Sequence, residues 1–513
     1  MAAFFLIARK GIPLKICTFG NKKKIIISHM KRTILLLLVL WAGLTTITAV
    51  AATSHRLCFN EGRFKIAQFT DLHWDANSKN NAQNRANILA VVQMEHPDLC
   101  VLTGDVVTER PSVEGWHEVI ALFEQTRTPY VVLMGNHDAE KLTEDSIYAL
   151  LEASPWHVGQ RGPAGITGAG NCVLPVYGSG AGSEAEALLY CLDSNDYPAT
   201  TRLGHYDWIH FDQIAWYREQ SRHYTQAHGG KPLPALMFFH IPLPEFELLS
   251  NDDATCGHQL EGVACSKVNS GMLASIIDEG DVMGVFCGHD HDNDCIGQFL
   301  DIALAYGRVS GLDAYGQLQR GARIIELHEG QRKFGSWIAT PQGREAIYYY
   351  PSGINSEQER LSVYSPAVAA KGLVPGVSYT YREGMFKSCN DLSNGTVKAR
   401  GTMSNFSIAD APAKDHFGYE YTGYIDVPER GVYNFYLYSD DGSRLYIDGK
   451  LVVDNDGSHS AERKGGHIAL EQGMHAIVLQ YFEDYMGQSL QVRVSARNMP
   501  EQDVPSSMLF HKQ

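Results

Sequence analysis

The sequence predicts a layered α/β domain followed by an all-β module, on two patterns of apolar residues. From Arg63 to about Ala339, short apolar runs alternate with segments whose apolar residues recur at helical spacing. Buried strands that alternate with helices are typical of a layered α/β domain. After residue 375, apolar and polar residues alternate at period two between turns rich in Asp and Gly. That pattern predicts an antiparallel β-sandwich.

The α/β part contains six apolar runs that we expect to be strands. They span residues 64–70, 99–103, 130–134, 188–192, 235–239 and 282–287. The expected helices lie between them, at residues 84–94, 113–125, 143–153, 211–223 and 271–278. Pro, Gly and polar residues then predict a linker over residues 341–374. We therefore expect one domain at residues 57–340 and a second at residues 375–497.

The first 52 residues have the composition of a targeting segment. Met30-Lys31-Arg32 precedes an uncharged apolar run from Ile34 to Ala42, and Ala49-Val50-Ala51 follows. This order predicts a secretory signal peptide after a basic extension, with translation starting at Met30. We expect a secreted or periplasmic protein with no stable membrane span after cleavage. The alternative is a membrane anchor formed by residues 34–52, since this run is just long enough to cross a bilayer.

The net charge argues against a nucleic-acid-binding protein, and the cysteine spacing argues against a zinc-finger protein. Of the 43 basic residues in the chain, eight lie in residues 1–32, so the rest carries 35 basic against 58 acidic residues. An acidic body repels nucleic acid, and no nucleic-acid partner is expected. No C-x-x-C pair exists, which argues against a zinc-finger site. Cys256 with Cys265, then Cys287 with Cys295, are the best candidate disulfide pairs.

Polar residues follow five of the expected strands directly. They are Asp71 and His73, then Gly104-Asp105, Gly135-Asn136-His137-Asp138, His240, and Gly288-His289-Asp290-His291. The carboxyl ends of strands in an open α/β sheet share one edge, where ligands bind, so we expect these residues to converge. A single His or Asp at such a position is usually structural. Five groups in one domain indicate a site.

The residue types of this site indicate a pair of metal ions. Imidazole and carboxylate suit Zn, Fe and Mn, and no thiolate joins them. Seven or eight ligands are more than one ion requires. They suit two cations about 3.5–4 Å apart, which together stabilise the attacking and the leaving oxygen of an in-line displacement at phosphorus. A carboxylate can bridge such a pair, and Asp105 is the natural candidate.

Together, D-L-H, G-D, G-N-H-D, a lone H and G-H-D-H resemble the motifs of the calcineurin-like metallophosphoesterases. The resemblance covers residues 63–340 and implies a two-sheet α/β sandwich with a dinuclear metal centre. The residues around His240 and Gly288 look most like the purple-acid-phosphatase-related branch.

The resemblance also implies the roles of single residues. One ion would be held by Asp71, His73, Asp105 and His291, and the other by Asp105, Asn136, His240 and His289. His137 would contact the phosphate and protonate the leaving oxygen, with Asp138 orienting its imidazole. The nucleophile would be a metal-bridging hydroxide.

Two positions qualify the resemblance. Purple acid phosphatases carry a Tyr three residues after the bridging Asp, where this chain has Thr108, so a specific requirement for Fe(III) is not implied. Arg308 is a candidate phosphate contact, because a guanidinium matches phosphate oxygens. A surface ion pair is the alternative for Arg308.

The C-terminal part resembles the PA14 β-sandwich through Tyr381-Arg382-Glu383-Gly384 and the run from Tyr438 to Gly449. PA14 modules are appended to glycosidases, adhesins and toxins, and many bind carbohydrate. Some adhesin members hold Ca²⁺ through paired Asp, which makes Asp440 and Asp441 candidates for a calcium or sugar site. The alternative is that Asp-Asp-Gly simply makes a tight turn.

Together these observations predict an exported, dinuclear metal-dependent phosphoesterase that acts on phosphorylated small molecules, most readily phosphomonoesters. Its metals would be divalent or trivalent Fe, Zn or Mn. One alternative is a phosphodiesterase with the same metal site. The other is a non-catalytic carbohydrate-binding protein that uses the PA14 domain. All the implied ligand positions and His137 are present, which argues against a catalytic relic.

Overall fold

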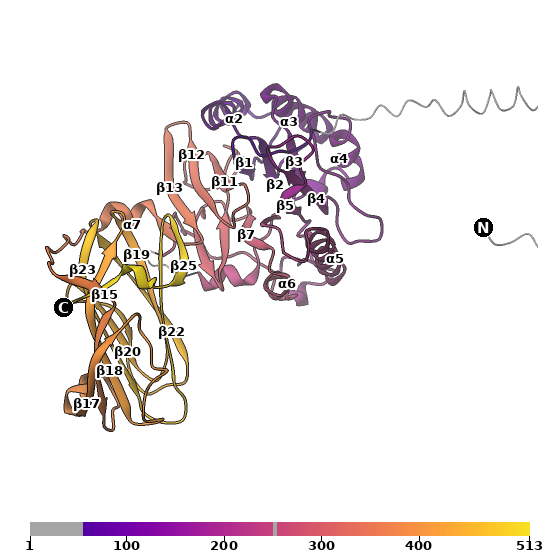
Figure 1. The fold of residues 1–513 in the computed structure, drawn as a ribbon. Coiled ribbons are helices and arrows are strands. Elements are labelled where there is room, and N and C mark those ends of the chain that lie inside the picture. Colours follow the sequence, from indigo (N-terminus) through magenta and orange to yellow (C-terminus); the bar gives the residue numbers. More distant parts are fainter. Residues whose placement is uncertain (1–54, 250–253) are drawn as a thin grey trace, which may run out of the picture. The chain divides into compact units, whose positions relative to one another are not determined.

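The computed structural model describes residues 55–249 and 254–513. The predicted signal peptide and the alternative anchor lie outside the described residues. Within the described part of the chain, no helix is both long and apolar enough to cross a membrane. Figure 1 shows the arrangement of the elements.

The first sheet has the strand order β14-β13-β12-β11-β1-β2-β3, and β10 pairs with β1. Its strands are β1 (Arg63–Thr70), β2 (Leu99–Thr103), β3 (Tyr130–Leu133), β10 (Arg308–Val309), β11 (Ala322–His328), β12 (Phe334–Thr340), β13 (Gly343–Tyr350) and β14 (Ile354–Asn355). β1, β2 and β3 run parallel, whereas β11 to β14 form an antiparallel extension.

The second sheet has the order β4-β5-β6-β7-β9-β8. Its strands are β4 (Cys172–Tyr177), β5 (Ala185–Cys191), β6 (Ala235–Phe238), β7 (Val282–Cys287), β8 (Ile296–Phe299) and β9 (Ile302–Tyr306). β5, β6, β7 and β9 are parallel. All six predicted apolar runs are therefore strands, with bounds that differ by a few residues.

Helices cover the outer faces of both sheets (Figure 1). They are α2 (Asn81–Glu95), α3 (Ser112–Thr126) and α4 (Glu144–Leu151) on the first sheet, and α5 (Phe211–Ala227) and α6 (Met272–Glu279) on the second. Each helix packs on its sheet through an apolar face. In α3, for example, Trp116, Val119 and Phe123 recur at helical spacing and are buried. A third apolar core, with Phe64, Leu236 and Phe286 among its members, fills the space between the sheets. The predicted two-sheet α/β sandwich is confirmed.

The segment predicted as a linker is only partly one. Residues 343–350 form β13, which pairs with β12 in the first sheet, and α7 (Ser356–Leu361) follows β14. In β13, Tyr348 and Tyr350 are buried whereas Arg344 and Glu345 lie in its more exposed first half. The sheet therefore extends through β14, about fifteen residues beyond the predicted boundary at residue 340, because neighbouring strands supply backbone partners for a polar sequence.

The C-terminal part is all β, as predicted, and its strands form two sheets. One has the order β15-β26-β18-β23-β20-β21, with β16 joining β17 to β18; the other has the order β22-β19-β24-β25. The first contains β15 (Leu373–Pro375), β16 (Val377–Glu383), β17 (Thr396–Met403), β18 (Phe417–Val427), β20 (Ser443–Ile447), β21 (Lys450–Asn455), β23 (Gly473–Glu483) and β26 (Leu509–Lys512). The second contains β19 (Gly431–Asp440), β22 (Glu462–Leu470), β24 (Ser489–Ala496) and β25 (Met499–Asp503).

One apolar core joins the two C-terminal sheets. Tyr419, Tyr421 and Tyr433 belong to it, so these rings pack the interior and are not available to a sugar. Tyr438 is exposed. The period-two pattern thus results from a sandwich that buries alternate side chains of each strand.

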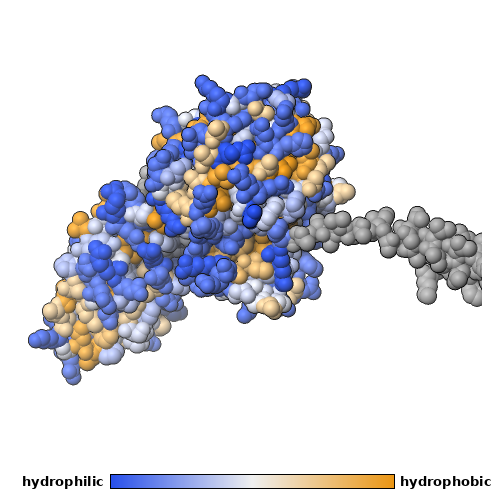
Figure 2. All heavy atoms as spheres, turned by 90° about the horizontal axis from the view of Figure 1, so that it is seen from above, coloured by the Kyte–Doolittle hydropathy of each residue, from blue (hydrophilic) through white to orange (hydrophobic). Residues whose placement is uncertain are grey.

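Figure 2 shows one face on which hydrophilic residues predominate between small apolar areas. All nine described cysteines are free thiols, so neither of the predicted disulfide pairs forms. The Sγ of Cys256 lies 3.8 Å from the Ile347 carbonyl and the Sγ of Cys287 lies 3.7 Å from the Ala305 carbonyl.

Candidate metal centre

The predicted ligands lie on tight turns at the carboxyl ends of five parallel strands. β1, β2 and β3 belong to the first sheet, and β6 and β7 to the second, so both sheets contribute to the site. Asp71, His73, Asp105 and His289 have φ angles of 51°, 43°, 49° and 78°. Left-handed backbone is uncommon for residues other than glycine, and such strain gathers at functional sites.

Two glycines of the motifs are required by close packing. A Cβ on Gly135 would lie 2.3 Å from the Asp105 Oδ1, and a Cβ on Gly288 would lie 1.9 Å from the Thr70 Oγ1. Both distances are shorter than any van der Waals contact. The glycines therefore let the turn after β3 approach the turn after β2, and the turn after β7 approach the end of β1.

The first cluster consists of Asp71, His73 and His291, which each offer one ligand atom within 4.8 Å of the others. His291 Nε2 lies 3.3 Å from Asp71 Oδ1. The other oxygen of Asp71 accepts hydrogen bonds from the Thr70 hydroxyl at 2.7 Å and the His289 N–H at 3.0 Å. These bonds leave Oδ1 facing the cluster.

The second cluster consists of Asp105, His240 and His289, again within 4.8 Å of one another. His240 is completely buried, and its Nδ1 lies 2.7 Å from the Thr103 carbonyl oxygen. Because that carbonyl can only accept, Nδ1 carries the proton and Nε2 is directed at the cluster. His240 Nε2 lies 3.3 Å from Asp105 Oδ2 and 3.2 Å from His289 Nδ1.

Asp105 lies between the two clusters. Its Oδ2 is 3.6 Å from His73 Nε2 and 3.3 Å from His240 Nε2, so one oxygen approaches a histidine of each set. Its Oδ1 accepts the His137 backbone N–H at 2.9 Å. Asn136, on the turn after β3, donates from Nδ2 to the Tyr197 hydroxyl at 3.1 Å. The residues are grouped in the same two sets that the resemblance implies.

The donor set fits a pair of metal ions. Five buried atoms of these residues have no hydrogen-bond partner: Asp71 Oδ1, His73 Nε2, Asn136 Oδ1, His289 Nε2 and His291 Nδ1. A buried polar atom without a partner costs about 1–3 kcal/mol, so five in one site need an explanation. Asp71 Oδ1 and His73 Nε2 lie beside the other ligand atoms of the centre, where cations would take up their lone pairs. In His289 and His291 the other ring nitrogen, Nδ1 and Nε2 respectively, faces the clusters.

The ionised carboxylates of the centre also favour positive charge beside them, on a bound cation or on a protonated imidazole. Burial raises the pKa of Asp71, but the charges on His291 and His240 outweigh this effect and lower the pKa to about 2. Burial likewise opposes ionisation of Asp105, yet His240 and His73 hold its pKa well below the usual range. Burial lowers the pKa of His240, and the Asp105 carboxylate reverses this and raises it to about 10. The two carboxylates therefore favour the protonated forms of His240 and His291, whereas burial lowers the pKa of His73 and lowers that of His289 to about 3.

The predicted role of Asp138 is wrong. Its carboxylate accepts three backbone N–H groups, from Val106 at 2.8 Å, Val107 at 3.0 Å and Gly135 at 2.8 Å. It therefore holds the turns after β2 and β3 together and does not orient the His137 imidazole. His137 Nδ1 instead lies 2.8 Å from Glu140 Oε1.

Arg308 does not face the site. It is 1% exposed, and its guanidinium donates to Asp294 Oδ2 at 2.6 Å, the Gln319 carbonyl at 2.7 Å and Glu345 Oε1 at 2.6 Å. The predicted phosphate contact is therefore not made, because internal partners occupy the guanidinium. The ion-pair alternative is closer to the structure, because Arg308 pairs with buried Asp294 and with Glu345 at the surface, although Arg308 itself is buried.

Aromatic side chains that the sequence reasoning missed surround the centre. The Tyr206 ring meets the His289 ring edge-on, with centroids 4.4 Å apart, and Tyr315 stacks on His291 at 3.9 Å. Both come from loops more than fifteen residues from the ligand they cover, so no local motif points to them. Glu140, by contrast, follows His137 by three residues and is recognisable from that spacing.

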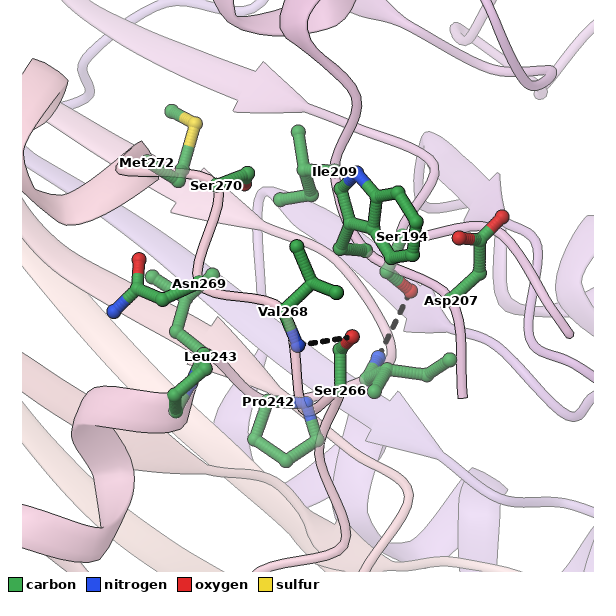
Figure 3. A pocket seen from close by; sticks show the side chains of 13 residues that line it. Ser194, Asp207, Ile209, Pro242, Leu243, Ser266, Val268, Asn269, Ser270 and Met272 are labelled. Carbon is green, nitrogen blue, oxygen red and sulfur yellow. Dashed lines mark hydrogen bonds between the residues drawn. The ribbon is translucent and has the colours of Figure 1, made fainter. Parts of the chain in front are cut away.

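A pocket lies behind the turn that carries His240. It is small, and its lining is mainly apolar, including Ile209, Pro242 and Met272. Figure 3 shows the Ser194 side chain inside it, where the Oγ accepts the Ile241 N–H at 2.9 Å. This bond ties the residue after His240 to the loop after β5, and so steadies the His240 backbone.

The C-terminal part contains a separate group of carboxylates. Asp440, Asp441 and Glu483 offer oxygens within 4.8 Å of one another. Asp441 accepts the His459 N–H at 2.9 Å and the Asp484 N–H at 2.7 Å. Glu483 was not predicted; burial, and then the charge of Asp441, raise its pKa to about 7. The run Asp440-Asp441-Gly442 is thus more than a turn, because a third acid from β23 joins it.

Comparison with known proteins identifies the family of this chain. The calcineurin-like phosphoesterase family profile matches residues 64–293. The protein named probable inactive purple acid phosphatase 29 of Arabidopsis thaliana is 32% identical over 57% of this chain and 85% of its own length. The chain belongs to the calcineurin-like phosphoesterases. Its relatives place it in the purple-acid-phosphatase-related branch.

This calcineurin-like phosphoesterase is also similar to a yeast phosphatase and to a solved dimetal phosphatase structure. Phosphatase DCR2 of Saccharomyces cerevisiae is 27% identical over 57% of this chain and 56% of its own length. A dimetal phosphatase from Danio rerio has 11% identity and a TM-score of 0.40, over 56% of this chain and 98% of its own. The PA14 domain profile matches residues 373–507, so the predicted C-terminal PA14 domain is confirmed.

Proposed function

We propose that the protein is an exported, metal-dependent phosphoesterase that hydrolyses phosphate monoesters. The observation that carries the proposal is the position of Asp105 between two clusters of buried ligand atoms, in which Asp71 Oδ1 and His73 Nε2 have no hydrogen-bond partner. A structural site would pair such atoms with one another or with the backbone. The signal-peptide pattern and the PA14 domain support export.

The residues of this chain have distinct tasks in the proposed reaction. Asp71, His73 and His291 would hold one cation, Asn136, His240 and His289 would hold the other, and Asp105 would contribute to both. Two cations would polarise the phosphate and stabilise the attacking and leaving oxygens. His137 would donate a proton from Nε2 to the leaving oxygen, because its Nδ1 is hydrogen-bonded to Glu140.

Some relatives bear names that describe them as probably inactive. The chain described here keeps a carboxylate, an amide or an imidazole at each position that the resemblance implies, together with His137. This completeness supports activity. The family resemblance favours monoesters, and a phosphodiesterase with the same ligands is the alternative.

Hydrolysis of para-nitrophenyl phosphate and bis-para-nitrophenyl phosphate, measured with Fe, Zn or Mn, tests the proposal. We expect the wild type to release para-nitrophenol from the monoester and to bind about two metal ions per chain. His240→Ala should lose the activity and the bound metal. The control is His228→Ala, since this partly buried residue hydrogen-bonds the Lys231 carbonyl and belongs to none of the ligand motifs. Faster release from the diester would support the alternative, and a protein without metal or turnover would refute both.

The three carboxylates of the PA14 domain support a second, accessory function in cation-assisted carbohydrate binding. We expect the protein to bind Ca²⁺ with a dissociation constant of about 10⁻⁴–10⁻³ M, as in other extracellular modules. Asp440→Asn should weaken binding at least tenfold in isothermal titration calorimetry, because it removes one charged ligand. Asp503→Asn is the control, with a side chain 66% exposed on β25. Equal Ca²⁺ binding by both variants would exclude this site.

A further inference from the structure

His137 has a carboxylate partner that lies outside the predicted site. His137 begins a short 3₁₀ turn, η1 (Asp138–Glu140), which returns Glu140 toward the His137 side chain. His137 Nδ1 and Glu140 Oε1 are 2.8 Å apart. The His137 ring also lies beside the metal centre, since its centroid is 5.8 Å from that of His73. The imidazole is thus held at one nitrogen and faces the site with its ring.

Glu140 is itself fixed by two other side chains. Its Oε2 accepts a hydrogen bond from Lys141 Nζ at 2.8 Å, and its Oε1 accepts one from the Tyr197 hydroxyl at 3.1 Å. The hydrogen bond to Lys141, more than any other contact, lowers the pKa of Glu140. The carboxylate is therefore ionised and has little freedom to rotate away from His137.

Tyr197 connects this pair to the metal centre. Its hydroxyl accepts the Asn136 Nδ2–H at 3.1 Å while it donates to Glu140. That bond turns the Asn136 amide so that Oδ1, which is buried without a partner, is the atom left for a cation. One tyrosine from the loop after β5 thus contacts Asn136 of the G-N-H-D motif directly and His137 of that motif through Glu140.

We propose that Glu140 is the positioning residue of His137, and that Tyr197 aligns Glu140 with the Asn136 amide. The inference rests on the proposed phosphoesterase function. Glu140 accepts the Nδ1–H of His137, so the proton that His137 transfers to the leaving oxygen comes from Nε2. Transfer of this proton turns the departing alkoxide into a neutral alcohol and the imidazolium of His137 into a neutral imidazole. The Nδ1–H stays hydrogen-bonded to Glu140. Asp138 cannot take this role because three backbone N–H groups occupy it.

A leaving-group comparison tests the role of Glu140. Para-nitrophenolate departs with little need of a proton, whereas an alkoxide must be protonated. We expect Glu140→Ala to lower kcat for glycerol 1-phosphate about 10- to 100-fold, but kcat for para-nitrophenyl phosphate less than about threefold. KM, metal content and melting temperature should stay unchanged. Asp145→Ala, which removes an acid paired with Arg161, is the matched control and should behave like the wild type.

A double-mutant cycle separates positioning from a general structural effect. If Glu140 acts through His137, then His137→Ala with Glu140→Ala should lose no more alkyl-phosphate activity than His137→Ala alone. Additive losses, or equal losses with both esters, would overturn the proposal. Glu140→Asp, which keeps the charge on a shorter side chain, should recover part of the lost activity.

A second measurement separates this inference from the proposed function. If the wild-type protein hydrolyses neither ester, the phosphoesterase proposal fails on its own. The pairing is then tested by NMR of the protein labelled with ¹⁵N-histidine, with the His137 signals assigned by their absence in His137→Ala. We expect protonated Nδ1 in the wild type and loss of that preference in Glu140→Ala. A His137 spectrum identical in both proteins would refute the positioning role.

Discussion

Asp105→Asn should lose at least one metal ion per chain and about 10³-fold in kcat for para-nitrophenyl phosphate, a loss of about 4 kcal/mol of transition-state stabilisation. Asp105 Oδ1 accepts the His137 N–H, so an asparagine would keep its oxygen there. Its NH₂ group would then stand where Oδ2 now lies, 3.6 Å from His73 Nε2 and 3.3 Å from His240 Nε2. An amide NH₂ donates hydrogen bonds and cannot bind a cation.

Elemental analysis and steady-state kinetics on the same preparation measure this effect. Asp75→Asn is the matched control, because Asp75 lies in the loop after β1 and its carboxylate accepts the Asn77 N–H at 2.8 Å. We expect the control to keep both ions and its full kcat. Two ions per chain and unchanged kcat in Asp105→Asn would show that the shared position of Asp105 has no functional meaning.

Arg308→Leu should destabilise the phosphoesterase domain by about 3–5 kcal/mol, which lowers its melting temperature by roughly 6–10 °C. The substitution leaves the carboxylate of Asp294 without its main partner, and Asp294 is completely buried. The surrounding protein cannot hydrate this charge. Burial raises the pKa of Asp294, but His258 and Arg308 lower it to about 2, so at neutral pH the group is ionised and needs a cationic neighbour.

Differential scanning calorimetry and the KM for the phosphomonoester distinguish this structural role from the phosphate contact expected from the sequence. Glu345→Gln is the control, because Glu345 is the exposed partner of Arg308, with 48% of its side chain accessible. It should change stability by at most about 1 kcal/mol. A raised KM with an unchanged melting temperature in Arg308→Leu would restore the phosphate-binding interpretation.

The architecture was accessible from the sequence because it depends on local patterns. Apolar runs between helical segments predicted the strands that carry the site, which are β1, β2, β3, β6 and β7, and their carboxyl ends predicted where polar side chains gather. The boundary at residue 340 was missed because β13 has polar and charged residues in its first half. Its strand character depends on pairing with β12, and that pairing is not visible in the residues of β13 alone.

The ligand residue types and their places at strand ends follow from the motifs, since chain neighbours such as Gly288 and His289 are fixed by covalent connection. The partners of those residues do not follow. Asp138 and Glu140 are both acids within three residues of His137, and sequence reasoning chose the nearer one. The three backbone N–H groups around Asp138 belong to turns after two different strands, and Tyr197 reaches Glu140 from 57 residues away.

The same distinction holds for Arg308 and Glu483. A guanidinium or a carboxylate has the same sequence signature whether it faces substrate or an internal counterion. Folding decides between them, because burial excludes water and leaves each charge with the partner that packing brings nearest. Residue chemistry and spacing thus identify the kind of site in this protein, whereas long-range packing assigns each side chain its partner.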